Sequence, residues 1–195
     1  MIQLDHPAYL AMREGAEVIE DDYYGDKVLR LPDGSYLKLF RRKRLLSSAA
    51  WYPYAQRFAD NAEALSNLGI PVPKIIAVMR IDSIRRDAVH YEPLAGAPLR
   101  ALMRNGLGDD TERQLKAKFN EFVVRLHNAG VYFRSLHLGN VILSPDGRMG
   151  LIDFSDLRIF RSSLPNYLRR RNIRRIEGIE EEKHWIDRSI VLGKR

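Results

Sequence analysis

The stretch Phe133-Arg134-Ser135-Leu136-His137-Leu138-Gly139-Asn140 decides the fold of this chain, together with Asp153-Phe154-Ser155 a short way after it. Short apolar runs fill most of the interval between them and flank a turn of Ser, Pro, Asp and Gly. Apolar runs on both sides of such a turn are typical of a tight hairpin. The sequence therefore predicts strands over 141–143 and 149–152, and the open end of this hairpin brings Asn140 close to Asp153.

An amide oxygen and a carboxylate that converge in this way suit Mg²⁺. Proteins usually hold this ion by one or two carboxylates, while water and phosphate oxygens complete its shell. Asn140 and Asp153 are therefore the expected metal ligands. Alternatively, both residues only cap neighbouring turns, which Asn and Asp also do well.

A second hairpin is predicted upstream, with strands over 28–31 and 35–40 and Asp-Gly in its turn. Lys38 stands in the middle of its second strand. An ammonium there needs an anion, because an unpaired buried charge is costly. Lys38 could also lie on the solvent-facing side of the strand, since Tyr36, Lys38 and Phe40 alternate with two leucines.

The rest of the chain reads as alternating helices and strands. The first expected element is a helix that is capped by Ser47 or Ser48, runs through Trp51 to Leu68 and stops at Gly69. Strands over 74–79 and 88–91 follow, and then the linker Glu92-Pro93-Leu94-Ala95-Gly96. An amphipathic helix is expected over 111–128, with its end at Asn128-Ala129-Gly130.

With these motifs in this order, residues 17 to about 160 resemble the small bacterial sugar and lipopolysaccharide kinases of the protein-kinase-like superfamily. More narrowly, the chain resembles the pseudomonad toluene-tolerance proteins, which are grouped with lipopolysaccharide-core kinases acting on Kdo or heptose. The resemblance implies one α+β kinase-like domain with a two-lobed fold. The N-lobe, a small antiparallel sheet, would span about 1–92, the hinge 93–98, and a truncated, mainly helical C-lobe 99–195.

The resemblance also implies ATP, Mg²⁺ and phosphoryl transfer to a hydroxyl of an inner-core sugar. Asn140 and Asp153 would hold the metal, Arg134 belongs to the catalytic loop, and Lys38 would hold the α- and β-phosphates. Glu92 directly precedes the hinge and Leu94 lies in it, and the backbone there would receive adenine. Glu63 is the expected helix partner of Lys38, although an alignment anchored on Gly69-Ile70-Pro71 puts Phe58 in that place and leaves Asp60 nearby.

Two departures from the family pattern concern the chemistry. Ser135 stands where the family has the aspartate base, and a serine hydroxyl does not accept a proton near neutral pH. His137 could take that role, because imidazole titrates in the working range. The phosphate-covering loop between Glu20 and Lys27 has one glycine among three acids, so it offers few amides to a phosphate and repels it.

Composition bounds the remaining possibilities. The 195 residues carry no cysteine, no long apolar run and no basic segment followed by an apolar core at the N-terminus. We therefore expect no disulfide, no transmembrane segment and no secretion signal, and a cytoplasmic location that could be peripheral at the inner face of the inner membrane.

The net charge of +7 is concentrated in two places. One is Arg41-Arg42-Lys43-Arg44, and the other follows Asp153 and comprises Arg158, Arg161, Arg169, Arg170, Arg171, Arg174 and Arg175. The second set is interleaved with leucines and isoleucines at helical spacing. Such a helix could pack with a solvated basic face, bind an anionic membrane surface or phosphorylated glycolipid, or bind nucleic acid. The sequence has no nucleic-acid-binding signature, which makes the last option the weakest.

Three functions stay open. The chain could be an active phosphotransferase on a lipopolysaccharide-core sugar, a pseudokinase that binds nucleotide and acts through a partner, or an RNA-associated kinase-like protein similar to the small kinases of tRNA-modification complexes. The first is chemically tolerable without the base, since phosphoryl transfer depends mainly on positioning and charge neutralisation.

Overall fold

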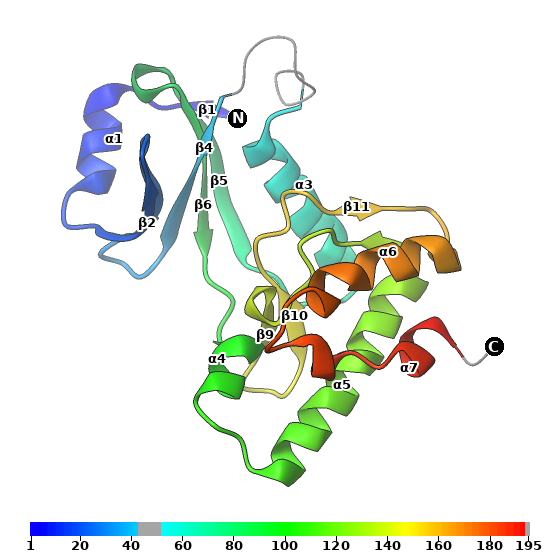
Figure 1. The fold of residues 1–195 in the computed structure, drawn as a ribbon. Helices are drawn as coiled ribbons and strands as arrows, with labels where there is room; N and C mark the ends of the chain where they lie inside the picture. The colour runs from blue at the N-terminus through cyan, green and yellow to red at the C-terminus, as the bar shows by residue number, and fades with distance from the viewer. Residues whose placement is uncertain (43–51, 194–195) are drawn as a thin grey trace. The chain divides into compact units, whose positions relative to one another are not determined.

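The structure is a computed structural model that describes residues 1–42 and 52–193. The chain forms two units, whose elements are labelled in Figure 1. Unit 1 comprises Met1–Glu63 and Val72–Pro93, and unit 2 comprises Ala64–Pro71 and Leu94–Arg195. Both units combine helices with mostly antiparallel strands, so the predicted α+β class is confirmed.

Unit 1 is built on a six-stranded sheet in the described residues, with the order β1-β5-β6-β4-β3-β2. The strands are β1 (Ile2–Gln3), β2 (Glu17–Asp22), β3 (Gly25–Arg30), β4 (Tyr36–Arg41), β5 (Lys74–Ile81) and β6 (Arg86–Glu92). Neighbouring strands are antiparallel except for β1, which is parallel to β5. The predicted hairpin of β3 and β4 and the strands β5 and β6 are therefore confirmed.

One helix lies on each side of this sheet (Figure 1). Helix α1 (His6–Arg13) is capped by Asp5, whose carboxylate accepts the Ala8 N–H at 2.8 Å. Its Tyr9 is buried with Leu37 and Leu39 of β4, which point to that side. Helix α3 (Tyr54–Asn67) covers the other side, and the expected cap and start at Ser47, Ser48 and Trp51 lie outside the described residues.

Unit 2 is mainly helical. Its described helices are α4 (Leu99–Arg104), α5 (Asp109–Asn128), α6 (Asn166–Glu177) and α7 (Arg188–Leu192), and its strands are β7 (Ala97–Pro98), β8 (Val131–Tyr132), β9 (Val141–Leu143), β10 (Met149–Leu151) and β11 (Arg158–Ile159). The strands pair in the orders β10-β9-β7 and β11-β8. The predicted amphipathic helix is α5. Its apolar face is buried and comprises Leu115, Phe119, Phe122, Val123 and Leu126.

Candidate active site

Strands β9 and β10 form the predicted hairpin, and their register pairs Val141 with Leu151. Asn140 directly precedes the first strand, and Ile152 and Asp153 directly follow the second. The backbone bridges the open end, because the Ile152 N–H donates to the Asn140 carbonyl at 3.0 Å. The prediction that one hairpin brings Asn140 and Asp153 to the same end is therefore confirmed.

The side chain of Asn140 is buried and fixed in one orientation. Its Nδ2 donates to the carbonyl of Ser135 at 3.0 Å, which ties the end of the predicted catalytic loop (residues 133–140) to its middle. The amide nitrogen is therefore in use. Its Oδ1 accepts no hydrogen bond from any residue that the structure describes, and this oxygen is the one that could bind a cation.

The backbone of Asp153 has an uncommon conformation. Its φ is 54°, in the left-handed region, while its side chain is exposed. The neighbours Leu151 and Phe154 are fully buried and hold this conformation in place. Left-handed backbone is uncommon for residues other than glycine, although Asp tolerates it better than most. Because strained residues gather at active sites, the geometry favours a role for this carboxylate beyond capping a turn.

The donor set fits Mg²⁺ bound together with a ligand. An amide oxygen and a carboxylate are both hard oxygen donors, which this ion prefers. Within residues 1–42 and 52–193, no three His, Asp or Glu side chains gather into a metal-binding group. A cation at this end of the hairpin would therefore take its remaining ligands from water or from phosphate.

Ser135 is paired with a carboxylate that the sequence analysis did not consider. Its Oγ donates to Oδ2 of Asp156 at 2.8 Å, although the two residues are separated by 21 positions. The other oxygen of this carboxylate, Oδ1, is buried and makes no hydrogen bond to the described residues. A hydroxyl and a carboxylate are therefore in contact at the position where the resemblance predicts a base.

His137 is held in its neutral form. Burial, reinforced by the positive charge of Arg100, lowers the pKa of His137 below its usual value. The Arg100 guanidinium lies 3.1 Å from Nδ1 and donates to it, so the ring proton is on Nε2. A Cβ on Gly139 would crowd both groups, which explains the glycine there. Because its acceptor nitrogen is already engaged, His137 is poorly suited to replace the base. Arg134 is exposed at the surface of the loop.

The catalytic loop is held from the C-terminal part of unit 2. Glu182, fully buried, accepts the Leu138 N–H at 2.9 Å and pairs with Arg100. Asn172 of α6 donates to the carbonyl of Phe133, and its Oδ1 accepts from His127 Nε2 at 2.9 Å. Both ends of the loop are therefore fixed by side chains that lie far away in the sequence.

Lys38, in unit 1, lies on the side of β4 that α3 covers. Its Nζ is 5.8 Å from the ring centre of Phe40 and 5.9 Å from that of Phe58, and the side chain is half-buried. Lys38 is therefore partly covered by aromatic side chains on this side of the strand. The α3 residue that the structure brings next to Lys38 is Phe58, as the anchored alignment had placed it.

The other predicted binding residues are more scattered. Glu63 is exposed on α3 and makes no ion pair with a described residue. Glu92 ends β6 and pairs with Lys74 at 2.9 Å, also exposed. Leu94 belongs to unit 2, where it packs so closely on Gly150 that a Cβ at that glycine would overlap it. The structure thus brings together Arg134, Ser135, His137, Asn140 and Asp153 in unit 2.

The segment expected to cover phosphates is a tight turn. Strands β2 and β3 are joined by Tyr23 and Tyr24 alone, and Asp22 accepts the Tyr24 N–H at 2.8 Å. The Tyr24 carbonyl in turn accepts from the buried Arg86 at 2.7 Å. A turn with only two linking residues offers few backbone amides to a phosphate, which agrees with the prediction for this loop.

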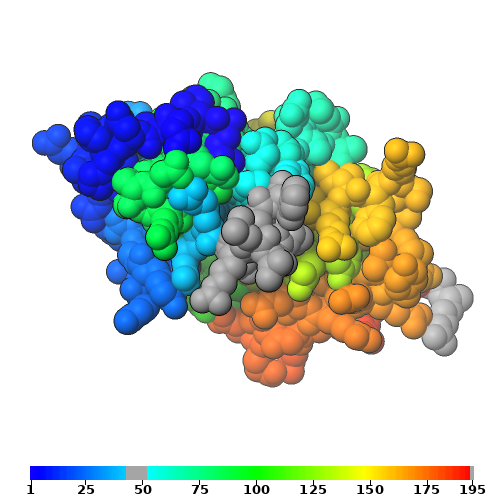
Figure 2. All heavy atoms as spheres, turned by 90° about the horizontal axis from the view of Figure 1, so that it is seen from above, coloured from blue at the N-terminus to red at the C-terminus, as the bar shows by residue number. Residues whose placement is uncertain are grey.

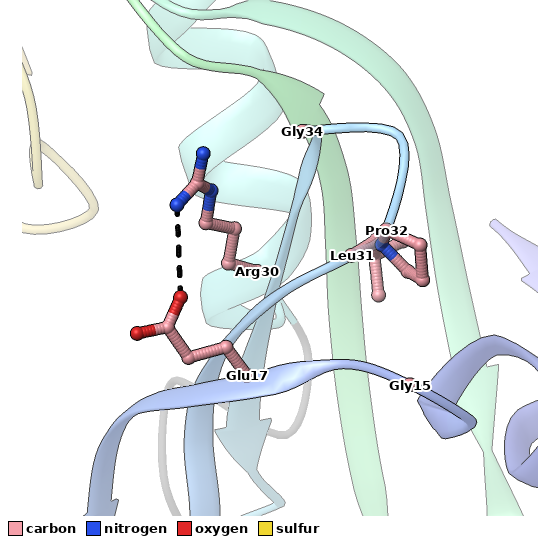
Figure 3. A pocket seen from close by; sticks show the side chains of 6 residues that line it. All are labelled: Gly15, Glu17, Arg30, Leu31, Pro32 and Gly34. Carbon is pink, nitrogen blue, oxygen red and sulfur yellow. Dashed lines mark ion pairs between the residues drawn. The ribbon is translucent and has the colours of Figure 1, made fainter.

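A separate hollow of about 220 Å³ lies in unit 1 near the β3–β4 turn (Figure 3). Its lining residues are Gly15, Glu17, Arg30, Leu31, Pro32 and Gly34. Glu17 and Arg30 form an ion pair across 3.6 Å, and both are exposed. None of the predicted site residues lines this hollow.

The arginine-rich segment divides into structural and exposed residues. Helix α6 buries Ile173 and Ile176 but exposes Arg170, Arg171 and Arg174, and the orange spheres of this segment lie on the outside in Figure 2. Arg169 differs, because it donates to Leu164 O at 2.8 Å and to Asn128 Oδ1 at 2.7 Å. The expected helix with an apolar and a basic face is therefore present, with one arginine used for packing.

The residues that sequence reasoning missed share one property. Asp156, Arg100, Asn172 and Glu182 reach the catalytic loop only through tertiary packing. A signal existed for Asp156 alone, because an acid three positions after Asp153 stands out beside a catalytic loop that lacks one.

Comparisons with protein families and curated proteins identified no relative of this chain. No protein-family model matches the chain, and no curated protein is significantly similar to it in sequence. None of the helices in the described part of the chain is both long and apolar enough to cross a membrane.

Proposed function

We propose that this protein binds ATP with Mg²⁺ through its catalytic loop and transfers a phosphoryl group to a sugar hydroxyl. The observation that carries the proposal is the open end of the β9–β10 hairpin, where Asn140 Oδ1 and the exposed Asp153 carboxylate leave neighbouring strand ends. The metal would neutralise charge on the phosphates. A two-lobed kinase-like arrangement and a lipopolysaccharide inner-core acceptor belong to this proposal, on the strength of the sequence resemblance.

The rigidity of the loop supports this role. Phosphoryl transfer depends mainly on holding groups in position, and a displacement of about 1 Å can cost about 10²-fold in rate. Here Phe133, Leu138 and Asn140 are each fixed by a side-chain hydrogen bond. A loop that only linked two strands would not require this many constraints.

A pseudokinase that binds nucleotide is the second candidate. The two-residue turn between β2 and β3 favours it, since few amides are available there for phosphates. The serine at the base position also favours it, unless another group accepts the proton. Turnover distinguishes the two candidates, whereas nucleotide binding is common to both.

The test is a calorimetric titration of the protein with ATP, with and without Mg²⁺. Asp153→Asn should weaken Mg²⁺-ATP binding much more than metal-free ATP binding, because only the former uses the carboxylate as a ligand. Asp146→Asn is the matched control. It removes the same charge from the turn at the other end of the same hairpin, where Asp146 only pairs with Arg148.

Each result has a distinct meaning. An equal loss with and without Mg²⁺ would show that Asp153 is not a metal ligand, and unchanged binding in both would remove the site. If binding behaves as proposed, hydrolysis of Mg²⁺-ATP by the parent then separates a phosphotransferase from a pseudokinase.

A further inference from the structure

The contact between Ser135 and Asp156 suggests how the catalytic loop compensates for its missing base. Ser135 Oγ donates to Asp156 Oδ2 at 2.8 Å, so a carboxylate lies one hydrogen bond away from the position where a base is needed. The inference that follows rests on the proposed phosphotransferase function.

Two structural features hold this pair together. Strand β8 directly precedes the catalytic loop, and the segment that contains Asp156 leads into β11. The two strands are antiparallel, with Tyr132 opposite Arg158. Ser135 shortly after β8 therefore faces Asp156 shortly before β11. A turn closed by Leu157 N–H and Phe154 O, with both side chains buried, fixes the carboxylate.

The hydrogen bonding of the Asp156 carboxylate is unusual for a residue with a purely structural role. Its Oδ1 is buried and accepts no hydrogen bond from the described residues. An unsatisfied buried oxygen costs free energy, and such exceptions call for an explanation, a catalytic role among them. A residue that served only to hold Ser135 would not require an ionisable group here.

The other candidates for the base are less suitable. His137 is neutral, and its acceptor nitrogen receives a hydrogen bond from Arg100. Asp153 is the proposed metal ligand, and a carboxylate bound to a cation is a weak proton acceptor. Asp156 is the carboxylate that contacts the residue at the base position.

We propose that Asp156 receives the proton of the attacking hydroxyl through Ser135. As the acceptor oxygen bonds to the γ-phosphorus, the bond from this phosphorus to the β–γ bridging oxygen breaks and ADP leaves. The acceptor proton passes to Ser135 Oγ, which gives its own proton to Asp156 Oδ2. The carboxylic acid then returns a proton to solvent by the reverse path. Ser135 touches the acceptor, and Asp156 is a positioning residue that acts through it.

The test uses the full chain, Mg²⁺-ATP as the probe and water as the phosphoryl acceptor. Asp156→Asn keeps an oxygen that accepts from Ser135 but cannot take a proton. It should therefore lower kcat by roughly 10²–10⁴-fold, the usual contribution of a positioned base. The KM and the calorimetric Kd for Mg²⁺-ATP should stay within about threefold of the parent, because Asp156 does not bind the nucleotide.

An exchange variant separates proton transfer from structure. Ser135→Asp combined with Asp156→Ser restores a hydroxyl and a carboxylate in contact, with the carboxylate now facing the acceptor. We expect its kcat to return to within about tenfold of the parent. Asp156→Ala removes the hydrogen bond as well as the charge, and thermal unfolding of each variant checks that it folds.

Each remaining result decides against the inference. If Asp156→Asn turns over like the parent, Asp156 is structural, and the same holds if only Asp156→Ala is slow. If the exchange variant is as slow as Asp156→Asn, the carboxylate is not a proton acceptor. A parent that binds Mg²⁺-ATP without hydrolysing it overturns the inference but keeps nucleotide binding. A parent that does not bind Mg²⁺-ATP overturns the proposed function itself.

Discussion

Glu182 offers the most direct test of how the catalytic loop is supported. Its side chain is fully buried, accepts the Leu138 N–H at 2.9 Å and pairs with Arg100, which in turn donates to His137. Glu182→Ala leaves the guanidinium and the amide without their partner. The loop should therefore loosen and unit 2 should lose stability.

The structure sets the size of this effect. Removing one partner of a buried ion pair costs about 3–5 kcal/mol, because the other charge stays uncompensated. The Arg100 side chain keeps 28% of its surface exposed, so water relieves part of this cost, while the unpaired Leu138 N–H adds about 1–3 kcal/mol. We therefore expect a loss of about 3–5 kcal/mol in the free energy of unfolding. For a chain of this size, that corresponds to a decrease of about 6–20 °C in Tm.

The measurement is tryptophan fluorescence during urea and thermal unfolding. A Trp51→Phe background leaves Trp185, which is buried in unit 2 close to Glu182, as the reporter. Glu181→Ala is the matched control, since the neighbouring glutamate forms an exposed pair with Arg104 and such pairs contribute little. Its Tm should stay close to that of the parent. If the two glutamate variants unfold at the same temperature, Glu182 does not support the loop.

Two further predictions concern charge. Burial lowers the pKa of His127 to about 4 from an unfolded value near 6.5, so the folded state binds fewer protons and loses stability as pH falls through this range. We expect the free energy of unfolding, measured by urea titration, to fall by about 2 kcal/mol between pH 7 and pH 5. His127→Gln should abolish this dependence on pH. A variant with Arg170, Arg171 and Arg174 changed to Gln should bind anionic vesicles about 100-fold more weakly at low salt, at about 1 kcal/mol per arginine, with an unchanged Tm. Vesicle sedimentation measures this binding, and equal binding by the parent and the variant would exclude a membrane role for α6. Arg169→Gln should instead lower the Tm, because it removes the hydrogen bonds to Leu164 and Asn128.

The sequence predicted the elements whose signals are local. The β9–β10 hairpin follows from apolar runs around Pro145, Asp146 and Gly147, and α5 follows from its apolar spacing. Helix α1 was missed although Asp5 at its cap and Pro7 in its first turn are ordinary start signals. Its eight residues are too few for a strong periodic pattern, and packing under the sheet stabilises it.

The candidate site was predictable only in part, for the same reason. Asn140 and Asp153 are linked by one hairpin, so local rules were enough to bring them together. The contact of Ser135 with Asp156 depends on the pairing of β8 with β11, two short strands without a sequence pattern. Which α3 residue meets Lys38 depends on the rotation of a helix against a sheet, and the choice of Glu63 over Phe58 could not be made from spacing alone.

The position of Glu182 in the sequence also determines when the catalytic loop can be fixed during synthesis. Leu138 leaves the ribosome 44 residues before the carboxylate that accepts its amide. At roughly 5–20 residues per second, this interval lasts about 2–9 s. During that time the nascent loop lacks Glu182, and for most of it the loop also lacks Asn172. A ribosome that pauses after Leu151 but before Glu182 would therefore carry a chain whose hairpin is complete while its catalytic loop is not yet fixed.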